Sequence, residues 1–291
     1  MSTYNLENNH LSIKVNSFGA ELCSVKSIQD GLEYIWQADK SVWARHAPNL
    51  FPIVGKLKNG EYFYQGQSYH LPQHGFARDM EFECIEQTPA KLVFELKNNE
   101  TTYQRYPFHF SYKVCYYLDN NLVVIQHIIS NTSDGELYFS VGAHPAFNCP
   151  LSDTESFEDY ELVFPGKSDL KLNVLQDGLI SDSTRILKLE QERLEVTDEL
   201  FASDALVCMD AQIEEVSLVS KKTNRGVTLR SFNWPYFGIW SKPLSNRFVC
   251  LEPWYGIADL ANSKGNLIDK TGIIKLESSQ HFSCEYSMNF F

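Results

Sequence analysis

Apolar and polar residues alternate along most of the chain, in short runs that turn residues separate. Residues 62–71 contain two such runs around Gln65-Gly66, and residues 81–97 repeat this plan around Thr88-Pro89-Ala90. A repeat of two residues is typical of a strand with one buried face, and Gly and Pro are typical of tight turns. The pattern therefore predicts a β-hairpin in each segment.

Two longer segments show the same alternation. Residues 110–130 contain two apolar runs joined by Asp119-Asn120-Asn121, and residues 215–240 contain two runs joined by residues 222–226. Asn and Gly accept the positive φ that tight turns require. Further strands are predicted at residues 11–15, 160–164, 205–209, 247–250, 272–277 and 282–288.

Helical periodicity is scarce. Its best candidate, residues 190–201, is short and contains the poor helix formers Val196 and Thr197. No Pro-, Gly- or Ser-rich linker divides the sequence, and no internal repeat indicates propeller blades. We therefore expect one all-β domain over residues 1–291, a large antiparallel two-sheet β-supersandwich of about twenty strands.

The charge of the chain restricts its partners. Its 291 residues include 25 Lys plus Arg against 37 Asp plus Glu, which gives a formal charge of −12. A protein that binds a nucleic acid or an anionic membrane surface needs a basic face. No Lys/Arg cluster in the sequence is large enough to form one. We therefore expect neither partner. A single small phosphate stays open, because two or three cations could hold it.

The cysteines and the first residues indicate the compartment. Seven cysteines are scattered without a CxxC pair, which gives no support to a zinc or redox motif. Residues 1–15 lack the apolar core of a signal peptide, and the sequence has no apolar run long enough to span a membrane. We expect reduced, largely buried cysteines in a cytoplasmic protein.

Three segments place proton-transferring side chains in aromatic or glycine-bearing surroundings. They are residues 73–79, 141–148 and 250–256, which contain His74, His144 and Glu252. A single histidine in such a turn is more often a capping or packing residue, and a single glutamate at a strand end often forms a salt bridge. Two histidines and a carboxylate together are what acid–base chemistry on a sugar requires.

The motifs of these segments resemble those of a known family. His-Gly-Phe-Ala-Arg, Gly-x-His-Pro-x-Phe-Asn and Leu-Glu-Pro-Trp are similar to motifs of the aldose 1-epimerase (galactose mutarotase) family, in particular its LacX-type branch. Residues 47–57 and 240–243 resemble the same branch, and the order of the motifs matches over nearly the whole chain. The resemblance implies a β-supersandwich of the galactose mutarotase type with a sugar-binding cleft. It also implies an isomerase that interconverts the α and β anomers of a hexose without a cofactor.

The resemblance further implies a role for each motif residue. Glu252 would be the general base that takes the proton of the C1 hydroxyl, and His144 the general acid that protonates the ring oxygen. His74 would hydrogen-bond the C1 or ring oxygen, and Asp204 would hold sugar hydroxyls. These roles need an ionised Glu252 and a protonated His144 near neutral pH, and they predict a bell-shaped pH dependence of turnover.

Lys56 departs from the resemblance, because galactose mutarotases have a sugar-contacting arginine at this position. A lysine keeps the charge but loses the two-pronged geometry of a guanidinium, which weakens the case for galactose as the preferred sugar. Arg78 could supply the missing donor or form a structural ion pair with Asp79. Among the aromatic residues, Phe147 and Trp240 are predicted beside the cleft.

Two other functions stay open. A hexose 6-phosphate mutarotase would share the fold, and Arg45, Lys56, Lys58 and Arg78 could form its phosphate pocket. A sugar-binding protein without turnover would keep only the cleft. A glycosidase is disfavoured because the motifs contain only one well-framed acid, and a metal-dependent cupin because the sequence has no His-x-His with a nearby Glu. We therefore expect no metal site.

Overall fold

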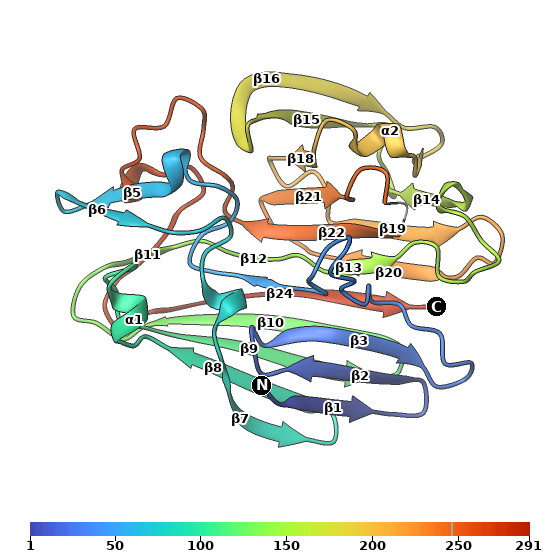
Figure 1. Cartoon of the computed structure of the whole chain (residues 1–291), viewed down its shortest axis with the longest axis horizontal. Helices are drawn as coiled ribbons and strands as arrows, with labels where there is room; N and C mark the ends of the chain where they lie inside the picture. Colours follow the sequence, from blue (N-terminus) through green and yellow to red (C-terminus); the bar gives the residue numbers. More distant parts are fainter. Residues whose placement is uncertain (246) are drawn as a thin grey trace.

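Strands dominate the computed structural model, which describes residues 1–245 and 247–291 (Figure 1). The long strands have two different faces because apolar side chains occupy every second position. In β10 (Leu122–Asn131), for example, Val123, Ile125 and Ile129 are fully buried while their neighbours are partly exposed. A strand of this kind is stable only where another layer covers its apolar face.

The larger of the two main sheets has nine antiparallel strands within the described residues. Their spatial order is β17 (Arg193–Glu195), β14 (Tyr160–Val163), β19 (Glu215–Ser220), β20 (Gly226–Arg230), β24 (His281–Phe290), β10, β9 (Phe110–Asp119), β8 (Lys91–Lys97) and β7 (Glu83–Thr88).

The second main sheet has eight antiparallel strands in the same part of the chain. Their order is β16 (Leu179–Lys188), β15 (Asp169–Gln176), β18 (Leu206–Cys208), β21 (Tyr236–Trp240), β22 (Phe248–Tyr255), β12 (Val141–Ala143) and β4 (Asn49–Leu50), and β13 (Ala146–Asn148) pairs with β22 beside β12.

The inner faces of the two sheets share one hydrophobic core. Leu251 of β22 and Ile239 of β21 belong to the same buried cluster as Leu229 of β20 and Met288 of β24. This packing of two antiparallel sheets confirms the predicted all-β supersandwich. Because the interior faces are filled, a site that binds a polar ligand has to lie on an outer face or at a sheet edge.

Smaller elements surround the two sheets. They are a three-stranded sheet of β1 (Thr3–Glu7), β2 (Leu11–Asn16) and β3 (Glu21–Ser27), the pairs β5 (Glu61–Tyr64) with β6 (Gln67–His70) and β11 (Leu137–Phe139) with β23 (Ile274–Leu276), and the single-turn helices α1 (Glu100–Tyr103) and α2 (Asp198–Phe201). No helix within residues 1–245 and 247–291 has the length and apolar character needed to cross a membrane.

The observed strands confirm most of the predicted ones. The hairpins at residues 62–71, 81–97 and 110–130 are β5–β6, β7–β8 and β9–β10. Residues 215–240 instead form three strands, because β21 leaves the first sheet and joins the second. Residues 190–201, the best candidate for a helix, are helical only at their end. Gln191 and Glu192 adopt positive φ in a turn, and β17 follows before the single turn of α2.

Strand β22 is longer than predicted, since it continues through Pro253 to Tyr255. A proline is tolerated inside a strand only where its nitrogen faces no ladder partner. The N–H of Leu251 donates to the Pro145 carbonyl, and the nitrogen of Pro253 points to the same side, where β12 and β13 are interrupted by His144 and Pro145. Glu252 therefore lies within a central strand rather than at its end.

Candidate active site

The two-residue repeat of β22 decides which side chains face the site. Leu251 turns into the shared core, so Cys250, Glu252 and Trp254 turn to the opposite face of the sheet. On the adjacent β21, Gly238 lies directly opposite Glu252 in the strand register. The outer face of the second sheet thus carries the polar group that the sequence motifs singled out.

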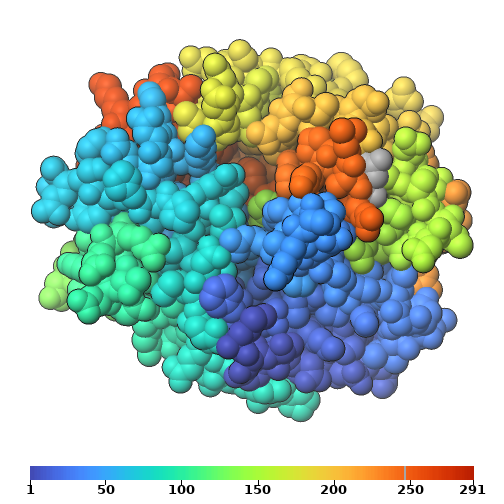
Figure 2. Space-filling model, viewed as in Figure 1, coloured from blue at the N-terminus to red at the C-terminus, as the bar shows by residue number. Residues whose placement is uncertain are grey.

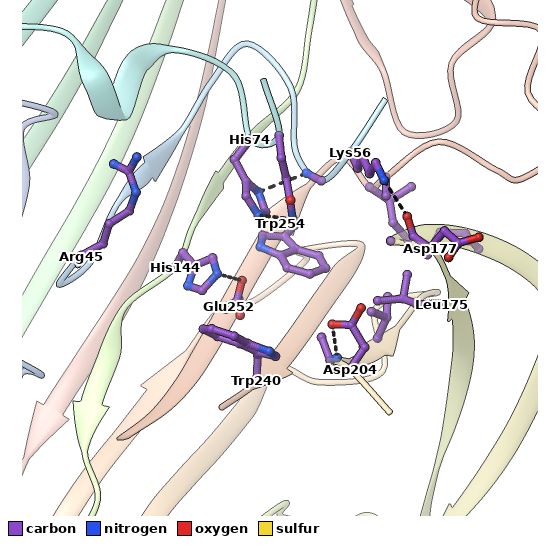
Figure 3. A pocket seen from close by; sticks show the side chains of 18 of the residues that line it. Arg45, Lys56, His74, His144, Leu175, Asp177, Asp204, Trp240, Glu252 and Trp254 are labelled. Carbon is purple, nitrogen blue, oxygen red and sulfur yellow. Dashed lines mark hydrogen bonds and ion pairs between the residues drawn. The ribbon is translucent and has the colours of Figure 1, made fainter. Parts of the chain in front are cut away.

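A cavity of about 510 Å³ opens on this outer face. Figure 2 shows the molecule hollowed near its centre, where segments from distant parts of the sequence meet. This volume is in the usual range for small-molecule sites. Seven of the eight side chains predicted to form the cleft line it: Lys56, His74, Arg78, His144, Asp204, Trp240 and Glu252 (Figure 3).

Glu252 and His144 form a close pair on the floor of the cavity. His144 follows directly after β12, which pairs with β22, and its Nε2 lies 3.0 Å from Glu252 Oε2 (Figure 3). Burial, with the charge of Asp204 as a further cause, raises the pKa of Glu252 well above its ordinary value. Burial, with the charge of Arg78, lowers the pKa of His144 to about 3. Both groups are therefore neutral in the free protein, and the two atoms are in contact without an aligned hydrogen bond among the described residues.

This neutral pair corrects one expectation from the sequence. We expected an ionised Glu252 and a protonated His144, but the pKa directions of both groups are the reverse in the free protein. The physical cause is the removal of both groups from water, which disfavours each charged form. The two atoms are close enough for one proton transfer to convert the neutral pair into the ionised pair.

His74 completes the polar floor and has strained backbone geometry. Its φ is +68°, and that of Gly75 is +72°, in the turn after β6. A Cβ on Gly75 would lie 2.2 Å from the carbonyl oxygen of Phe51, so glycine alone fits there. A non-glycine residue at positive φ is strained, and such strain is concentrated at functional sites.

The hydrogen bonds of His74 define its ring as a donor. The backbone N–H of Gly55 donates to His74 Nδ1 over 3.1 Å, which places the ring proton on Nε2, 3.3 Å from the side-chain amide of Gln73. Burial, with nearby positive charge, lowers the pKa of His74 well below its ordinary value, so the ring is neutral. A neutral N–H donor in a buried position can stabilise negative charge that develops on a bound oxygen.

Asp204 and Lys56 lie at the same end of the cavity (Figure 3). Asp204 also has a positive φ, +96°, and its Oδ1 accepts the N–H of Ala205 over 2.8 Å. Lys56 Nζ donates to the carbonyl oxygen of Asp177 over 2.9 Å, which connects two segments of the rim. The lysine that departs from the family pattern is thus partly engaged with the backbone.

Three of the four cations that could form a phosphate pocket line the cavity: Arg45, Lys56 and Arg78. Arg45 lies on the far side of His144 from Lys56 (Figure 3), and its Nη2 contacts Asp79 Oδ1 over 2.9 Å. Lys58 donates to the carbonyl oxygen of Ser263 instead of lining the cavity among the described residues. Arg45 and Arg78 both contact Asp79, Lys56 lies across His144 from Arg45, and Lys58 is absent from the lining, so the four predicted cations do not form one group.

Arg78 lines the cavity and also contacts Asp79, so its position is compatible with both roles that the sequence left open. Its guanidinium lines the cavity, where Nη2 donates to the carbonyl oxygen of Gln73 over 2.6 Å. Its Nε lies 3.8 Å from Asp79 Oδ2 in a weak ion pair. Burial lowers the pKa of Arg78 to about 10, so the group stays charged at neutral pH.

Three tryptophans form the aromatic part of the site, and two of them were not predicted there. The ring of Trp43 stacks on His144 with 5.0 Å between centroids, and the ring of Trp240 meets His144 edge-on at 6.0 Å. Trp254 lines the floor. The placement of Phe147 beside the cleft is wrong, since its side chain packs in the core against Phe290. The alternation of β13 turns it away from the outer face.

The ring of Trp254 fits between two glycines of the flanking strands. A Cβ on Gly142 would lie 2.8 Å from its Cδ1, and a Cβ on Gly238 would lie 2.3 Å from its Cη2. We expect Gly238→Ala to lower the free energy of unfolding by about 1–3 kcal/mol, because the ring has to shift within a packed wall. Denaturant unfolding followed by tryptophan fluorescence measures this. Gly135→Ala is the control, because a Cβ there meets no atom within 4 Å; equal losses in both variants would contradict the expectation.

The chemistry available in the cavity is proton transfer. Glu252 and His144 hold one mobile proton, His74 offers a fixed N–H, and Asp204, Lys56 and Arg78 offer hydrogen bonds to polar groups at the two ends. Flat aromatic rings beside such groups suit the apolar face of a polar ring. The set can move a proton between two oxygens of one small molecule.

Comparisons with known proteins agree with this picture. A family model described as aldose 1-epimerase matches residues 2–275. Two proteins of Lactococcus lactis subsp. lactis, plasmid and chromosomal forms of Protein LacX, are each 32% identical to the chain over 283 residues, 94% of either length.

Solved structures of high similarity include two from lactobacilli. A galactose mutarotase related enzyme from Lactobacillus acidophilus is 38% identical with a TM-score of 0.95, and the match covers 100% of this chain and 97% of that one. A galactose mutarotase-like protein from Lactobacillus casei is 27% identical with a TM-score of 0.91, and all of both chains is covered. The resemblance that the motifs indicated is confirmed.

Proposed function

The chain belongs to the aldose 1-epimerase family, and on this basis we propose that it interconverts the α and β anomers of a hexose by opening and closing the sugar ring. Family membership establishes the isomerase class. The observation that supports the finer proposal is the 3.0 Å approach of His144 Nε2 to Glu252 Oε2 at the floor of a sugar-sized cavity.

The proposed reaction begins with the proton of the pair on His144. Glu252 takes the proton of the C1 hydroxyl, the C1–O1 bond becomes a carbonyl, and the C1–O5 bond breaks as O5 takes the proton of His144. Rotation about C1–C2 presents the other face of the aldehyde. Ring closure then runs the same transfers in reverse, so that each residue alternates between acid and base.

The sugar itself helps to ionise the pair. Burial favours the neutral pair in the free protein, but sugar hydroxyls that donate to Glu252 replace the water it has lost and favour the carboxylate. The N–H of His74 stabilises charge on the C1 or ring oxygen. Asp204 and Lys56 hold hydroxyls at one end of the ring, and Arg78 at the other.

The direct test measures anomerisation of α-glucose and α-galactose by polarimetry, with the same sugars as 6-phosphates in parallel. We expect a faster approach to anomeric equilibrium for free hexoses, and no preference for the phosphorylated forms, because Arg45 and Arg78 are paired with Asp79 and Lys56 donates to a backbone carbonyl. A clear preference for 6-phosphates would favour the alternative mutarotase. Sugar binding without any acceleration would contradict the proposed activity.

The pKa shifts predict a broad pH profile. The active form of the pair holds one proton, so activity is lost when a second proton binds to His144 or when the last one leaves Glu252. Because the pKa of His144 is lowered from 6.5 to about 3 and that of Glu252 is raised well above 4.5, we expect kcat/KM to show no acid limb near pH 6.5 and to fall only on the alkaline side of the Glu252 pKa. Rates are measured in the presence of a chelator, because histidine binds trace metals. An acid limb centred near pH 6.5 would contradict this expectation.

The proposed place of action is the cytoplasm. All seven cysteines of the chain are unpaired where the structure describes them, and five of them are buried. Reduced cysteines of this kind are typical of compartments that keep thiols reduced, which supports the proposal.

A further inference from the structure

His144, Cys250 and Glu252 direct one metal-ligating atom each toward a common point. These three atoms lie within 4.8 Å of one another, and all three residues are buried. The strand register explains the arrangement. Cys250 and Glu252 are two residues apart and share the outer face of β22, while His144 enters from the adjacent β12. The mechanism proposed above uses the histidine and the glutamate but not the thiol.

We propose that these three residues bind a soft divalent cation such as Zn²⁺, and that the bound ion blocks the acid–base pair. Imidazole nitrogen, thiolate sulfur and carboxylate oxygen are the ligands that zinc prefers. Three protein ligands leave the fourth tetrahedral position for a water on the cavity side. The binding part of this proposal is independent of the proposed function, and only the inhibition rests on it.

The charge balance of the cluster favours a divalent ion. Binding requires loss of the thiol proton and of the proton that the histidine and glutamate share, which leaves one thiolate and one carboxylate around an ion of charge +2. The cluster is then neutral, and a neutral cluster avoids most of the free energy that a buried net charge would cost. The positive charges of Arg45 and Arg78 disfavour binding of a cation in this cavity, while the negative charge of Asp204 favours it.

The geometry needs only small movements. Zinc bonds of about 2.0–2.3 Å place tetrahedral ligand atoms roughly 3.3–3.8 Å apart, so atoms now at most 4.8 Å apart have to approach by about 1 Å. The His144 ring packs against Trp43 and Trp240 and can shift only slightly, but no hydrogen bond holds its buried Nδ1 among the described residues. An ion would reach the cluster through the sugar cavity, because His144 and Glu252 line it while Cys250 is fully buried.

The test titrates the metal-free full-length protein with Co²⁺, whose thiolate complexes absorb in the near ultraviolet, and then displaces it with Zn²⁺. We expect a thiolate-to-cobalt band in the wild type and in Cys208→Ala, a matched buried cysteine that faces the core. Cys250→Ala is expected to lack the band. If the wild type lacks the thiolate-to-cobalt band, or if Cys250→Ala keeps it, the proposed metal site is wrong. If Cys250→Ala does not fold, Cys250→Ser replaces it in the same measurement.

A second readout compares the turnover of each variant with zinc against its own turnover without zinc. Removal of a residue that only hydrogen-bonds a metal ligand lowers metal affinity about 10–100-fold. Cys250→Ala removes a ligand itself, so we expect the zinc concentration that halves its turnover to be at least about tenfold higher than in the wild type. Equal sensitivity of wild type and Cys250→Ala would overturn the inhibition. If the protein proves to have no mutarotase activity, the cobalt band still decides whether the site exists.

Discussion

Glu252→Gln is expected to lower the turnover number for hexose anomerisation by about a thousandfold while sugar binding persists. Glutamine has nearly the volume and hydrogen-bonding shape of glutamate, so the packing of this fully buried position is kept. It cannot take a proton from the C1 hydroxyl, however, and its amide cannot share a proton with His144 across 3.0 Å. Polarimetry measures the turnover, and quenching of the cavity tryptophans by added sugar measures the binding.

The stability of this variant separates a chemical defect from misfolding. The pKa of Glu252 is raised in the folded protein, so the folded state keeps a proton that the unfolded chain loses above pH 4.5. The wild type therefore loses stability as the pH rises from the pKa of Glu252 in the unfolded chain to its higher pKa in the folded protein. Glu252→Gln lacks this loss, and we expect a smaller drop in its free energy of unfolding between pH 5 and pH 8.

Asp177→Asn is the matched control for Glu252→Gln. Asp177 is an exposed acid on the cavity rim whose backbone carbonyl, rather than its carboxylate, accepts from Lys56. The turnover of Asp177→Asn is expected to stay within about twofold of that of the wild type, because substitutions at exposed positions usually change stability and packing little. Normal turnover in Glu252→Gln would show that another group is the base.

The second large effect is expected at Asp259, which connects three segments of the chain, two of which belong to the cavity wall. Its Oδ1 accepts from Lys270 Nζ over 2.9 Å, and its Oδ2 accepts the backbone N–H of Lys58 over 2.9 Å. Its own N–H donates to the Lys56 carbonyl, and its carbonyl accepts the N–H of Ile180. Asp259 and Lys270 are each 3% exposed at the side chain, so this ion pair is buried.

We expect Asp259→Asn to lower the free energy of unfolding by about 3 kcal/mol, because the ammonium of Lys270 is left buried without its counter-charge. The segments that Asp259 connects carry Lys56 and Ile180 of the cavity wall, so KM for the sugar is expected to rise more than kcat falls. Urea unfolding and initial rates at varied sugar concentration measure the two effects.

The exposed Asp269, one residue before Lys270, provides the control for Asp259. Asp269→Asn is expected to change stability by less than about 0.5 kcal/mol, as exposed positions usually do. The double variant Asp259→Asn with Lys270→Met removes both charges and is expected to recover part of the lost stability. If Asp259→Asn proves as stable as the wild type, the ion pair between Asp259 and Lys270 contributes nothing to the free energy of unfolding.

The sequence contained enough to predict the hairpins and the polar floor of the site. Local alternation and turn residues determine β9–β10, because both strands and their turn are contiguous in the chain. His74, His144 and Glu252 were found because each lies in a short motif of its own. Their convergence was expected, and the structure places all three in one cavity.

What the sequence did not predict depends on long-range register. Whether Phe147 faces the core or the cleft depends on how β13 aligns with β22, which no local pattern specifies. The same is true of Cys250, whose thiol was interpreted as a core group but lies beside the acid–base pair. Trp43 lies outside any strand, so no periodicity indicated that it would stack on His144.

The alternating faces of β21 and β22 separate two kinds of mutational constraint. Ile239 and Leu251 point to the core and determine whether the chain folds, while Trp240 and Glu252 line the cavity and determine what it admits. Two adjacent residues of one strand can therefore be altered with almost independent consequences. A directed-evolution library restricted to the outward positions of these strands is expected to contain mostly folded proteins with changed sugar preference, which makes this sheet a favourable scaffold for engineering.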